Sequence, residues 1–138
     1  MNFRGVATLT RGNKTRISTE DEIAHGMAYF PITGNVTLGS AQSGYICLVT
    51  SGSGVTVTLP AVASSAGLNY LIGNMVDQNL TINGPAANTV VTVNDLDSDG
   101  VAYSTSSQKI GALAFAFCNG SYWFIVNLSV ACAMTVTT

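Results

Sequence analysis

Residues 117–122 read Phe-Cys-Asn-Gly-Ser-Tyr, and this stretch predicts a tight β-hairpin. Asn-Gly readily takes the positive φ angles that a two-residue type I′ turn requires. Pairing outward from that turn puts residues of one face opposite each other: Phe117 with Tyr122, Phe115 with Phe124, and Leu113 with Val126. This face of the hairpin is therefore strongly apolar.

The other face of the same hairpin is apolar too, although most of its side chains are small. It carries Ala112, Ala114, Ala116, Trp123 and Ile125. A half-solvated antiparallel pair would place polar residues there. We therefore expect both faces to be covered, one by a second sheet of the domain and one by a neighbouring subunit. We assign the alanine and tryptophan face to the contact between subunits. A central strand pair wrapped by its own loops explains the pattern equally well.

The rest of the chain beyond Pro31 consists of short apolar or alternating runs separated by Gly, Asn, Ser and Pro. This spacing predicts an all-β fold, an antiparallel sandwich or barrel, in which no helix exceeds two turns. We expect strands at residues 35–38, 45–50, 55–59, 70–74, 80–82, 89–93, 108–117, 122–127 and 131–136.

The first part of the chain differs from the rest, so we divide it into an N-terminal arm, residues 1–30, and a β domain, residues 31–138. Thr19 followed by Glu22 matches a capping box, which predicts a short helix over residues 18–26 of the arm. The charged residues cluster here: none lies between Gly26 and Val76, and none follows Lys109.

Only 9% of the residues are charged, and the net charge is −2. Globular domains usually carry about 25% charged residues, and a surface this poor in charge is expected where partners cover it. The chain has no basic stripe for nucleic acid. It also has no apolar run of the roughly 20 residues that a membrane span needs. We predict an assembly protein that binds neither nucleic acid nor membrane.

Catalytic chemistry finds little support in the sequence. His25 is the single histidine and fits the end of the predicted arm helix. Cys47, Cys118 and Cys132 lack metal-ligand spacing and are expected as buried thiols. Asp95, Asp97 and Asp99 alternate as in a calcium loop, but Ser106 stands where such a loop needs Glu. We expect a solvated acidic turn, with calcium binding left open, and predict no enzyme activity and no cofactor.

Four short stretches, taken in order, resemble the β-rich structural proteins of tailed bacteriophages. They are Val55-Thr-Val-Thr-Leu-Pro-Ala61, Tyr70-Leu-Ile-Gly-Asn74, Asn79-Leu-Thr-Ile-Asn-Gly-Pro85 and Asn119-Gly-Ser-Tyr-Trp-Phe124. These proteins serve as capsid decoration (cement) proteins and as tail fibre or spike domains. The resemblance implies a jelly-roll-like or tulip-like domain that forms a homotrimer on the virion.

A chain with a charged arm and no coiled-coil or collagen-like shaft is more similar to a cement protein than to a fibre. The resemblance therefore implies binding to the major capsid protein on the outer capsid surface, after assembly in the host cytoplasm. A tail fibre or spike subunit for receptor binding is the alternative. We expect the arm to contact the shell, with Phe3 as an apolar anchor and with Arg4, Arg11, Lys14 and Arg16 facing acidic groups.

Overall fold

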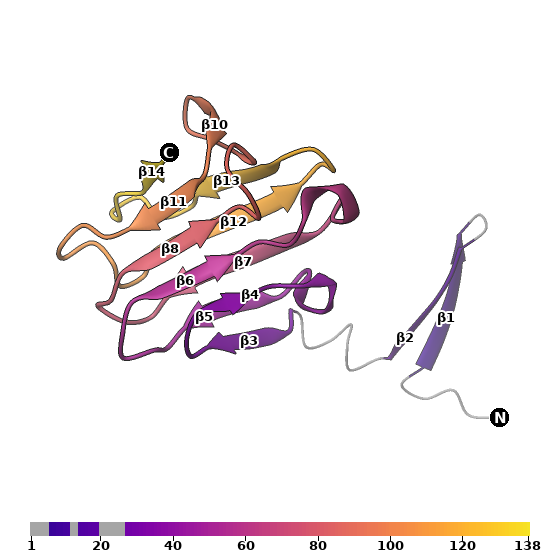
Figure 1. The fold of residues 1–138 in the computed structure, drawn as a ribbon. Coiled ribbons are helices and arrows are strands. Elements are labelled where there is room, and N and C mark those ends of the chain that lie inside the picture. The colour runs from indigo at the N-terminus through magenta and orange to yellow at the C-terminus, as the bar shows by residue number, and fades with distance from the viewer. Residues whose placement is uncertain (1–5, 12–13, 20–26) are drawn as a thin grey trace.

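The computed structural model describes residues 6–11, 14–19 and 27–138 of the chain, and residues 27–138 form a β-sandwich (Figure 1). The seven strands of the larger sheet lie in the order β10 (Asp95–Ser98), β9 (Val90–Thr92), β13 (Trp123–Asn127), β12 (Leu113–Cys118), β7 (Asn69–Asn74), β5 (Ile46–Val49) and β3 (Tyr29–Ile32). The five strands of the smaller sheet lie in the order β14 (Thr135–Thr137), β11 (Gly100–Tyr103), β8 (Leu80–Asn83), β6 (Val55–Thr58) and β4 (Val36–Thr37). The predicted all-β sandwich is confirmed.

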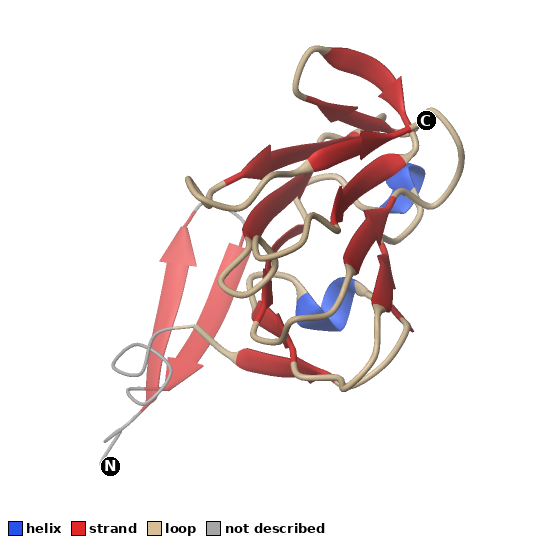
Figure 2. Ribbon diagram, turned by 90° about the vertical axis from the view of Figure 1, so that its left-hand side faces the viewer, coloured by secondary structure: helices blue, strands red, loops and turns tan. Residues whose placement is uncertain are grey.

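In the first half of the sandwich the chain winds like a solenoid, passing alternately through the larger and the smaller sheet. We call this winding of parallel strands the coil. Strands β3, β5 and β7 pair in parallel in the larger sheet, while β4, β6 and β8 pair in parallel in the smaller one. Each passage from the smaller sheet back to the larger one contains a 3₁₀ turn, η1 (Ser40–Gln42) or η2 (Val62–Ser64), drawn in blue in Figure 2. The chain thus makes three stacked rungs of two strands each.

The second and third rungs of the coil are related by one spacing along the chain, whereas fewer residues separate the first rung from the second, in which Tyr29 pairs with Ile46 and Val36 with Val57. Ile46 pairs with Leu71 in the larger sheet and Val55 pairs with Leu80 in the smaller one, and both pairs have the same separation along the chain. The same spacing relates Tyr45 to Tyr70 and Pro60 to Pro85. Residues 45–60 and 70–85 are therefore successive copies of one structural repeat, in which each rung packs on its neighbour.

The second half of the sandwich reverses direction and closes the stack. β11 pairs antiparallel with β8, and β12 pairs antiparallel with β7. β13 and β14 then add to β12 and β11, again antiparallel. Both sheets are consequently mixed, which corrects the expectation of a purely antiparallel sandwich. The correction has a topological cause, because a coil that returns to the same sheet in the same direction must make parallel neighbours.

The edge of the coil at β3 is protected by a proline. The carbonyl groups of Ala28 and Ile32 accept hydrogen bonds from the β5 side, so the backbone groups of Pro31 point away from the sheet. Proline has no N–H to offer on that open edge. The stack therefore ends at its first rung without presenting a full row of donors to another strand.

Three large aromatic side chains cross the core and join the two layers. Trp123 donates its Nε1–H to the carbonyl of Pro60 at 2.8 Å, and Tyr70 donates its hydroxyl to the carbonyl of Gly39 at 2.7 Å. Tyr103 crosses in the other direction and donates to Asn127 Oδ1 at 2.9 Å. The rings of Tyr70 and Trp123 stack with their centroids 5.7 Å apart. Each ring buries its apolar body and satisfies its polar atom on backbone or amide oxygen.

The β12–β13 hairpin forms where predicted, with a different register. Phe117 pairs with Phe124 and Phe115 with Val126. Cys118 pairs with Trp123, so the turn comprises residues 119–122 and is wider than the predicted one. Within it, Asn119 Oδ1 accepts hydrogen bonds from the backbone N–H groups of Ser121 and Tyr122. The shift along β13, from Tyr122 to Phe124 as the partner of Phe117, is an even number of positions, so each side chain keeps its predicted face.

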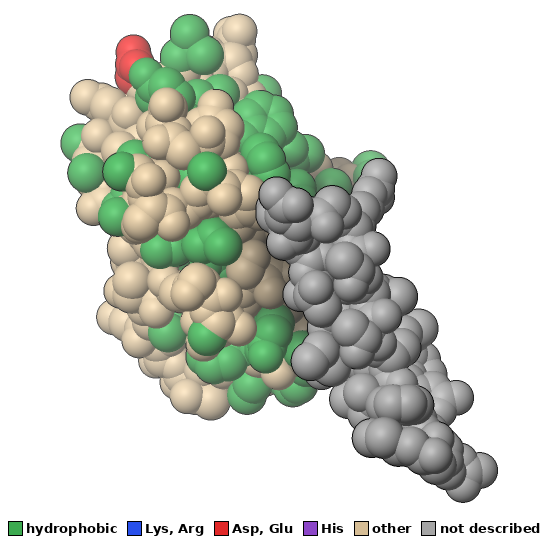
Figure 3. Space-filling view, turned by 90° about the vertical axis from the view of Figure 1, so that its right-hand side faces the viewer, with side chains coloured by type: hydrophobic (Ala, Val, Ile, Leu, Met, Phe, Trp, Pro, Cys, Tyr) green, Lys and Arg blue, Asp and Glu red, His purple; other side chains and the backbone are tan. Residues whose placement is uncertain are grey.

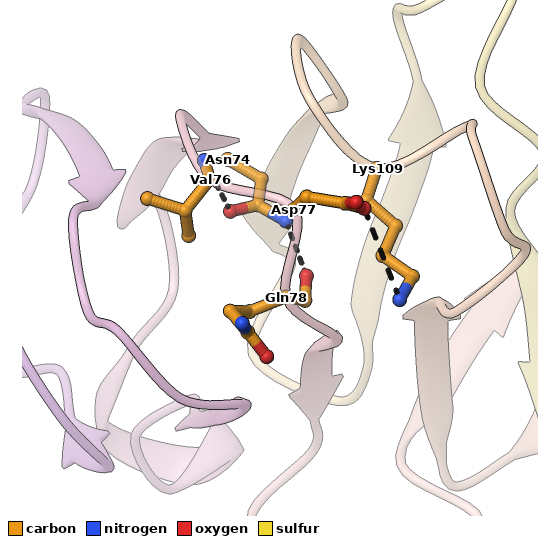
Figure 4. Close-up of polar contacts among 5 residues, drawn as sticks. All are labelled: Asn74, Val76, Asp77, Gln78 and Lys109. Atoms are coloured by element: carbon orange, nitrogen blue, oxygen red, sulfur yellow. Dashed lines mark hydrogen bonds and ion pairs between the residues drawn. The ribbon is translucent and has the colours of Figure 1, made fainter.

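A second polar turn follows β7 (Figure 4). Asn74 is 2% exposed, and its Nδ2 donates to the carbonyl of Gln78 at 2.8 Å while its Oδ1 accepts from the N–H of Val76 at 3.3 Å. Lys109 Nζ lies 4.0 Å from Asp77 Oδ1 across the same corner. These contacts fix the chain between β7 and β8, which is a structural role.

The arm contains an antiparallel strand pair, β1 (Val6–Arg11) and β2 (Lys14–Thr19). Ser18 and Thr19 belong to β2, so the helix predicted from residue 18 does not include them as helical residues. The rest of that predicted helix, residues 20–26 with His25, lies outside the described residues. The sandwich itself begins with β3 at Tyr29, slightly before the predicted boundary at residue 31.

Candidate interaction surface

The face assigned from the sequence to a contact between subunits lies inside the sandwich. Trp123, Ala114 and Ala116 are 0% exposed, and Ala112 and Ile125 are 1% exposed. The alanines are small because large side chains stand beside them on the inner side of the sheet: Ala116 pairs with both Tyr70 and Ile125. This assignment is therefore wrong, and the opposite face of the hairpin is the one that points outward.

The outer face of the larger sheet is continuously apolar. Its central row runs across five strands, and adjacent members pair in register: Tyr29, Ile46, Leu71, Phe115 and Val126. A second row on one side of it consists of Phe117, Phe124 and Val91, next to Asn69. Three members of these rows are well exposed, Tyr29 at 54%, Phe124 at 49% and Phe117 at 39%. We call these two rows the apolar outer face.

A third row borders the apolar outer face on its other side and continues its chemistry. It consists of Pro31, Leu48, Gly73 and Leu113, each in register with its neighbour. A Cβ built on Gly73 would lie 2.7 Å from Leu48 Cδ2 and 3.3 Å from Leu113 Cδ1. The two leucines thus close over the glycine and keep the surface level.

A shallow hollow adjoins this face where β9 separates from β13. The two strands pair at only two positions, Trp123 with Val90 and Phe124 with Val91. Beyond them the Thr92 hydroxyl, rather than a strand N–H, donates to the carbonyl of Ile125 at 2.9 Å. The resulting hollow of about 370 Å³ is lined by residues 92–94 and 124–127. It extends the apolar surface to the turn of the β9–β10 hairpin, where Val93 is exposed, as is Leu96 in β10.

The outer face of the smaller sheet has a different chemistry. Side chains on this side of the sheet are almost all hydroxyl or amide bearing: Thr37, Thr56, Thr58, Thr81, Asn83, Thr135 and Thr137, with Gly100 and Ala102 between them. Threonine combines a high strand propensity with a hydroxyl that water can solvate. We call this surface the threonine face. Its composition is the one expected of a sheet surface in contact with water.

Charge is almost absent from the sandwich. Residues 27–138 contain one basic residue, Lys109, and four acidic ones, Asp77, Asp95, Asp97 and Asp99. Hydrophobic and uncharged polar groups fill nearly all of the described surface in Figure 3, where red occurs only at the top. None of the five charged side chains belongs to the apolar outer face or the threonine face.

The aspartates predicted as an acidic turn lie largely in a strand, β10, which corrects that expectation. Asp95 Oδ1 accepts the N–H of Asp97, and Asp99 Oδ1 accepts the N–H of Asn88, so two of these carboxylates are occupied by backbone donors. Within the described ranges 6–11, 14–19 and 27–138, no group of three or more His, Cys, Asp or Glu side chains is placed to hold a metal ion. The structure thus offers no calcium loop at this position.

The three cysteines are free and buried, as the sequence predicted. Burial raises the pKa of the Cys47 thiol to about 11. A thiol held in its neutral form is a poor nucleophile. These residues act as small core side chains.

The predicted shell-contact residues fall into two groups. Arg11 ends β1 and Lys14 begins β2, and the two residues pair in register; Arg16 lies further along β2. Phe3 and Arg4 lie outside the described residues. The pairing of β1 with β2 thus places the basic positions Arg11 and Lys14 opposite each other. The contact of the arm with the shell stays a prediction.

Sequence reasoning missed the part of the apolar outer face that β3, β5 and β7 contribute. A signal for it was present in β5, because Ile46-Cys-Leu-Val49 is apolar at every position rather than at alternate ones. Such a run is typical of a strand covered on both faces.

Comparison of the chain with known protein families, with curated proteins and with solved structures gave no match. None of the helices in the described part of the chain is long and apolar enough to cross a membrane. Function has to be argued from the surfaces themselves.

Proposed function

We propose that this chain is a virion structural protein, a capsid decoration (cement) protein that binds the assembled major capsid protein shell and stabilises it. The observation that carries the proposal is the apolar outer face of a sandwich that is otherwise nearly uncharged. A contiguous apolar patch of this extent marks a surface that contacts other protein. The resemblance of four strand-forming stretches to phage structural proteins supplies the choice of partner.

The stabilisation would act by mass action. A protein that binds the assembled shell and not its free subunits lowers the free energy of the shell, by an amount that grows with the logarithm of its concentration relative to its Kd. The arm provides the polar part of such a contact, since Arg11 at the end of β1 pairs with Lys14 at the start of β2 and Arg16 follows in β2. Basic side chains of this kind pair with acidic groups on a partner and speed its encounter.

The coil of parallel strands favours a second candidate, a subunit of a tail fibre or spike. Stacked rungs that pack on their neighbours, as β5 and β6 pack on β7 and β8, are the construction of elongated repeat structures. Here the stack has three rungs and is closed by β11 and β12 at one end and by Pro31 at the other. The closed stack favours a compact shell-bound domain over a shaft.

Co-sedimentation with genome-free shells of the virus that encodes the chain tests the proposal. The full chain should sediment with the shells, and a variant carrying Arg11→Glu and Lys14→Glu should not. Lys109→Gln is the matched control, because it removes a basic residue from the sandwich and should leave shell binding unchanged. A chain that ignores shells and binds host cells instead would replace the cement function by the tail function.

A further inference from the structure

We propose that the apolar outer face is a self-association surface, against which the same face of a second copy of this chain packs. This inference rests on the same face that carries the proposed function: it assigns the apolar outer face to the contact between copies of the chain and leaves the contact with the shell to the arm. The contact between subunits thereby moves from the inner face of the hairpin, which is buried in the core, to the outer face of the sheet. A contact between identical faces pairs two copies, in place of the three copies of the expected homotrimer.

The two outer faces of the sandwich provide an internal comparison. Where a sheet meets water, this chain places threonine and asparagine at successive register positions, as in Thr56, Thr81 and Asn83. On the larger sheet the corresponding outward positions carry Ile46, Leu71 and Phe115. The two outer faces of one chain therefore differ in composition: one is suited to contact with water, and the other is suited to contact with protein.

The chemistry of this face favours another copy of itself as the occupant. It carries no charged side chain, and its polar members are few, with Asn69 at the end of one row. Selecting an unrelated partner usually relies on complementary charge and hydrogen bonds. Contact between identical apolar surfaces needs neither, and the interfaces of homodimers are accordingly the more apolar class.

Shape points to the same occupant. Sheets twist with a fixed hand, and two of them pack face to face at about 10 Å with their strands roughly aligned. Two copies of one sheet share the same twist, so their outer faces match without adjustment. The level surface that Leu48 and Leu113 make over Gly73 extends the area available for this packing.

The area comes close to that of a specific contact. Strands lie about 4.8 Å apart and rise about 3.3 Å per residue, so a patch five to six strands wide and about five residues long covers roughly 400–480 Å². Two copies would then bury roughly 800–950 Å² in total, close to the 1,000 Å² or so at which specific interfaces begin. Val93 and Leu96 at the margin would add to it.

The experiment compares the same substitution on the two outer faces of the full-length chain. Phe124→Lys puts a charge on the apolar outer face, and Thr56→Lys puts the same charge on the threonine face. Sedimentation velocity over a wide range of protein concentration should show an oligomer for the parent chain and for Thr56→Lys. Phe124→Lys should weaken self-association by roughly 100-fold or more, because the contact would bury an unpaired charge among apolar side chains. Circular dichroism spectra of both variants at 20 °C should match that of the parent, which separates lost assembly from lost folding.

Three outcomes would overturn the proposal: a parent chain that is monomeric at every concentration, an oligomer that Phe124→Lys leaves intact, or one that Thr56→Lys disrupts equally. A variant that lacks residues 1–25 tests whether the arm, rather than a second copy of the chain, covers the apolar outer face. If the parent is monomeric and the deletion variant associates, then the arm covers this face instead of a second copy.

Discussion

At the scale of single residues, Gly100 shows how closely two strands of the smaller sheet approach. A Cβ at this position would collide with the carbonyl oxygen of Ile82 and lie 2.9 Å from the Cα of Asn83. Both obstacles are backbone atoms of the adjacent strand β8, which cannot rotate away as a side chain could. The glycine in β11 is therefore required by space.

Gly100→Ala should lower the free energy of unfolding by about 1–3 kcal/mol, the usual cost of forcing an extra carbon into a packed region. Gly52→Ala is the control, because a Cβ there meets nothing within 4 Å. Chemical denaturation of both variants measures the difference. Equal stability of the two variants would show that β8 and β11 can separate without cost.

Two tyrosines and one cysteine, all buried, make the stability of the fold depend on pH in the alkaline range. Burial raises the pKa of Tyr70 and of Tyr103 to about 12 from an ordinary value of 10, and that of Cys47 to about 11 from 9. Between the ordinary and the raised value the unfolded chain has lost a proton that the folded chain still holds. The stability these groups provide is therefore complete below their ordinary pKa values and is lost as pH rises through the raised ones.

Denaturant titrations at a series of pH values should show a constant free energy of unfolding below about pH 9 and a decline from there to about pH 12, the window set by these pKa values. Tyr103→Phe should make the decline shallower above pH 10, because one titrating group is gone. An identical slope in the parent and the variant would mean that Tyr103 titrates alike in both states.

At the scale of elements, the predictable part of the fold was local. The strands expected at residues 55–59, 70–74 and 80–82 each lie within a residue or two of β6, β7 and β8. Their alternating side chains and flanking turn residues specify a strand without reference to its neighbours. The parallel pairing of those strands depends on contacts one full period apart, such as Val55 with Leu80, which no single strand encodes.

The missed strands have individual causes. β11, Gly100–Tyr103, is buried at every position between β8 and β14 and so shows no alternation. β10 carries Asp95 and Asp97, which a turn would also carry. β3 contains Pro31, which is unfavourable in a strand except at an open edge. The coil does leave a signal in the sequence, an internal repeat in which Tyr45 and Pro60 recur as Tyr70 and Pro85.

The coil should accept an additional rung. Inserting a second copy of residues 46–70 between Tyr70 and Leu71 adds one full period, as the pairing of Ile46 with Leu71 defines it. Because each rung packs mainly on its neighbours, we expect a folded chain with a melting temperature at or above that of the parent. Calorimetry and circular dichroism measure this.

The matched control inserts residues 46–69, one residue fewer. That insert would shift the following strands by one position and turn their core side chains outward. We expect it to unfold or aggregate. If the two inserts behave alike, the period that the strand register shows is not what holds the rungs in place.

At the scale of the whole molecule, charge and apolar surface are separated. The basic positions Arg11, Lys14 and Arg16 lie in the β1–β2 pair, whereas the apolar outer face lies on the larger sheet of the sandwich. The two proposed contacts, arm with shell and sheet with sheet, therefore depend on different forces. Salt acts on these forces in opposite directions, since it screens exposed charges and does not weaken apolar burial.

A salt series should consequently separate the two contacts in one preparation. Self-association of the chain should stay constant or strengthen as salt is raised, while its binding to shells should weaken, and Arg11→Glu should change only the second. Sedimentation of the chain alone and with shells provides both measurements. Self-association that fell with salt would indicate a charged contact, and because the apolar outer face has no charge to screen, the contact would have to lie elsewhere on the molecule.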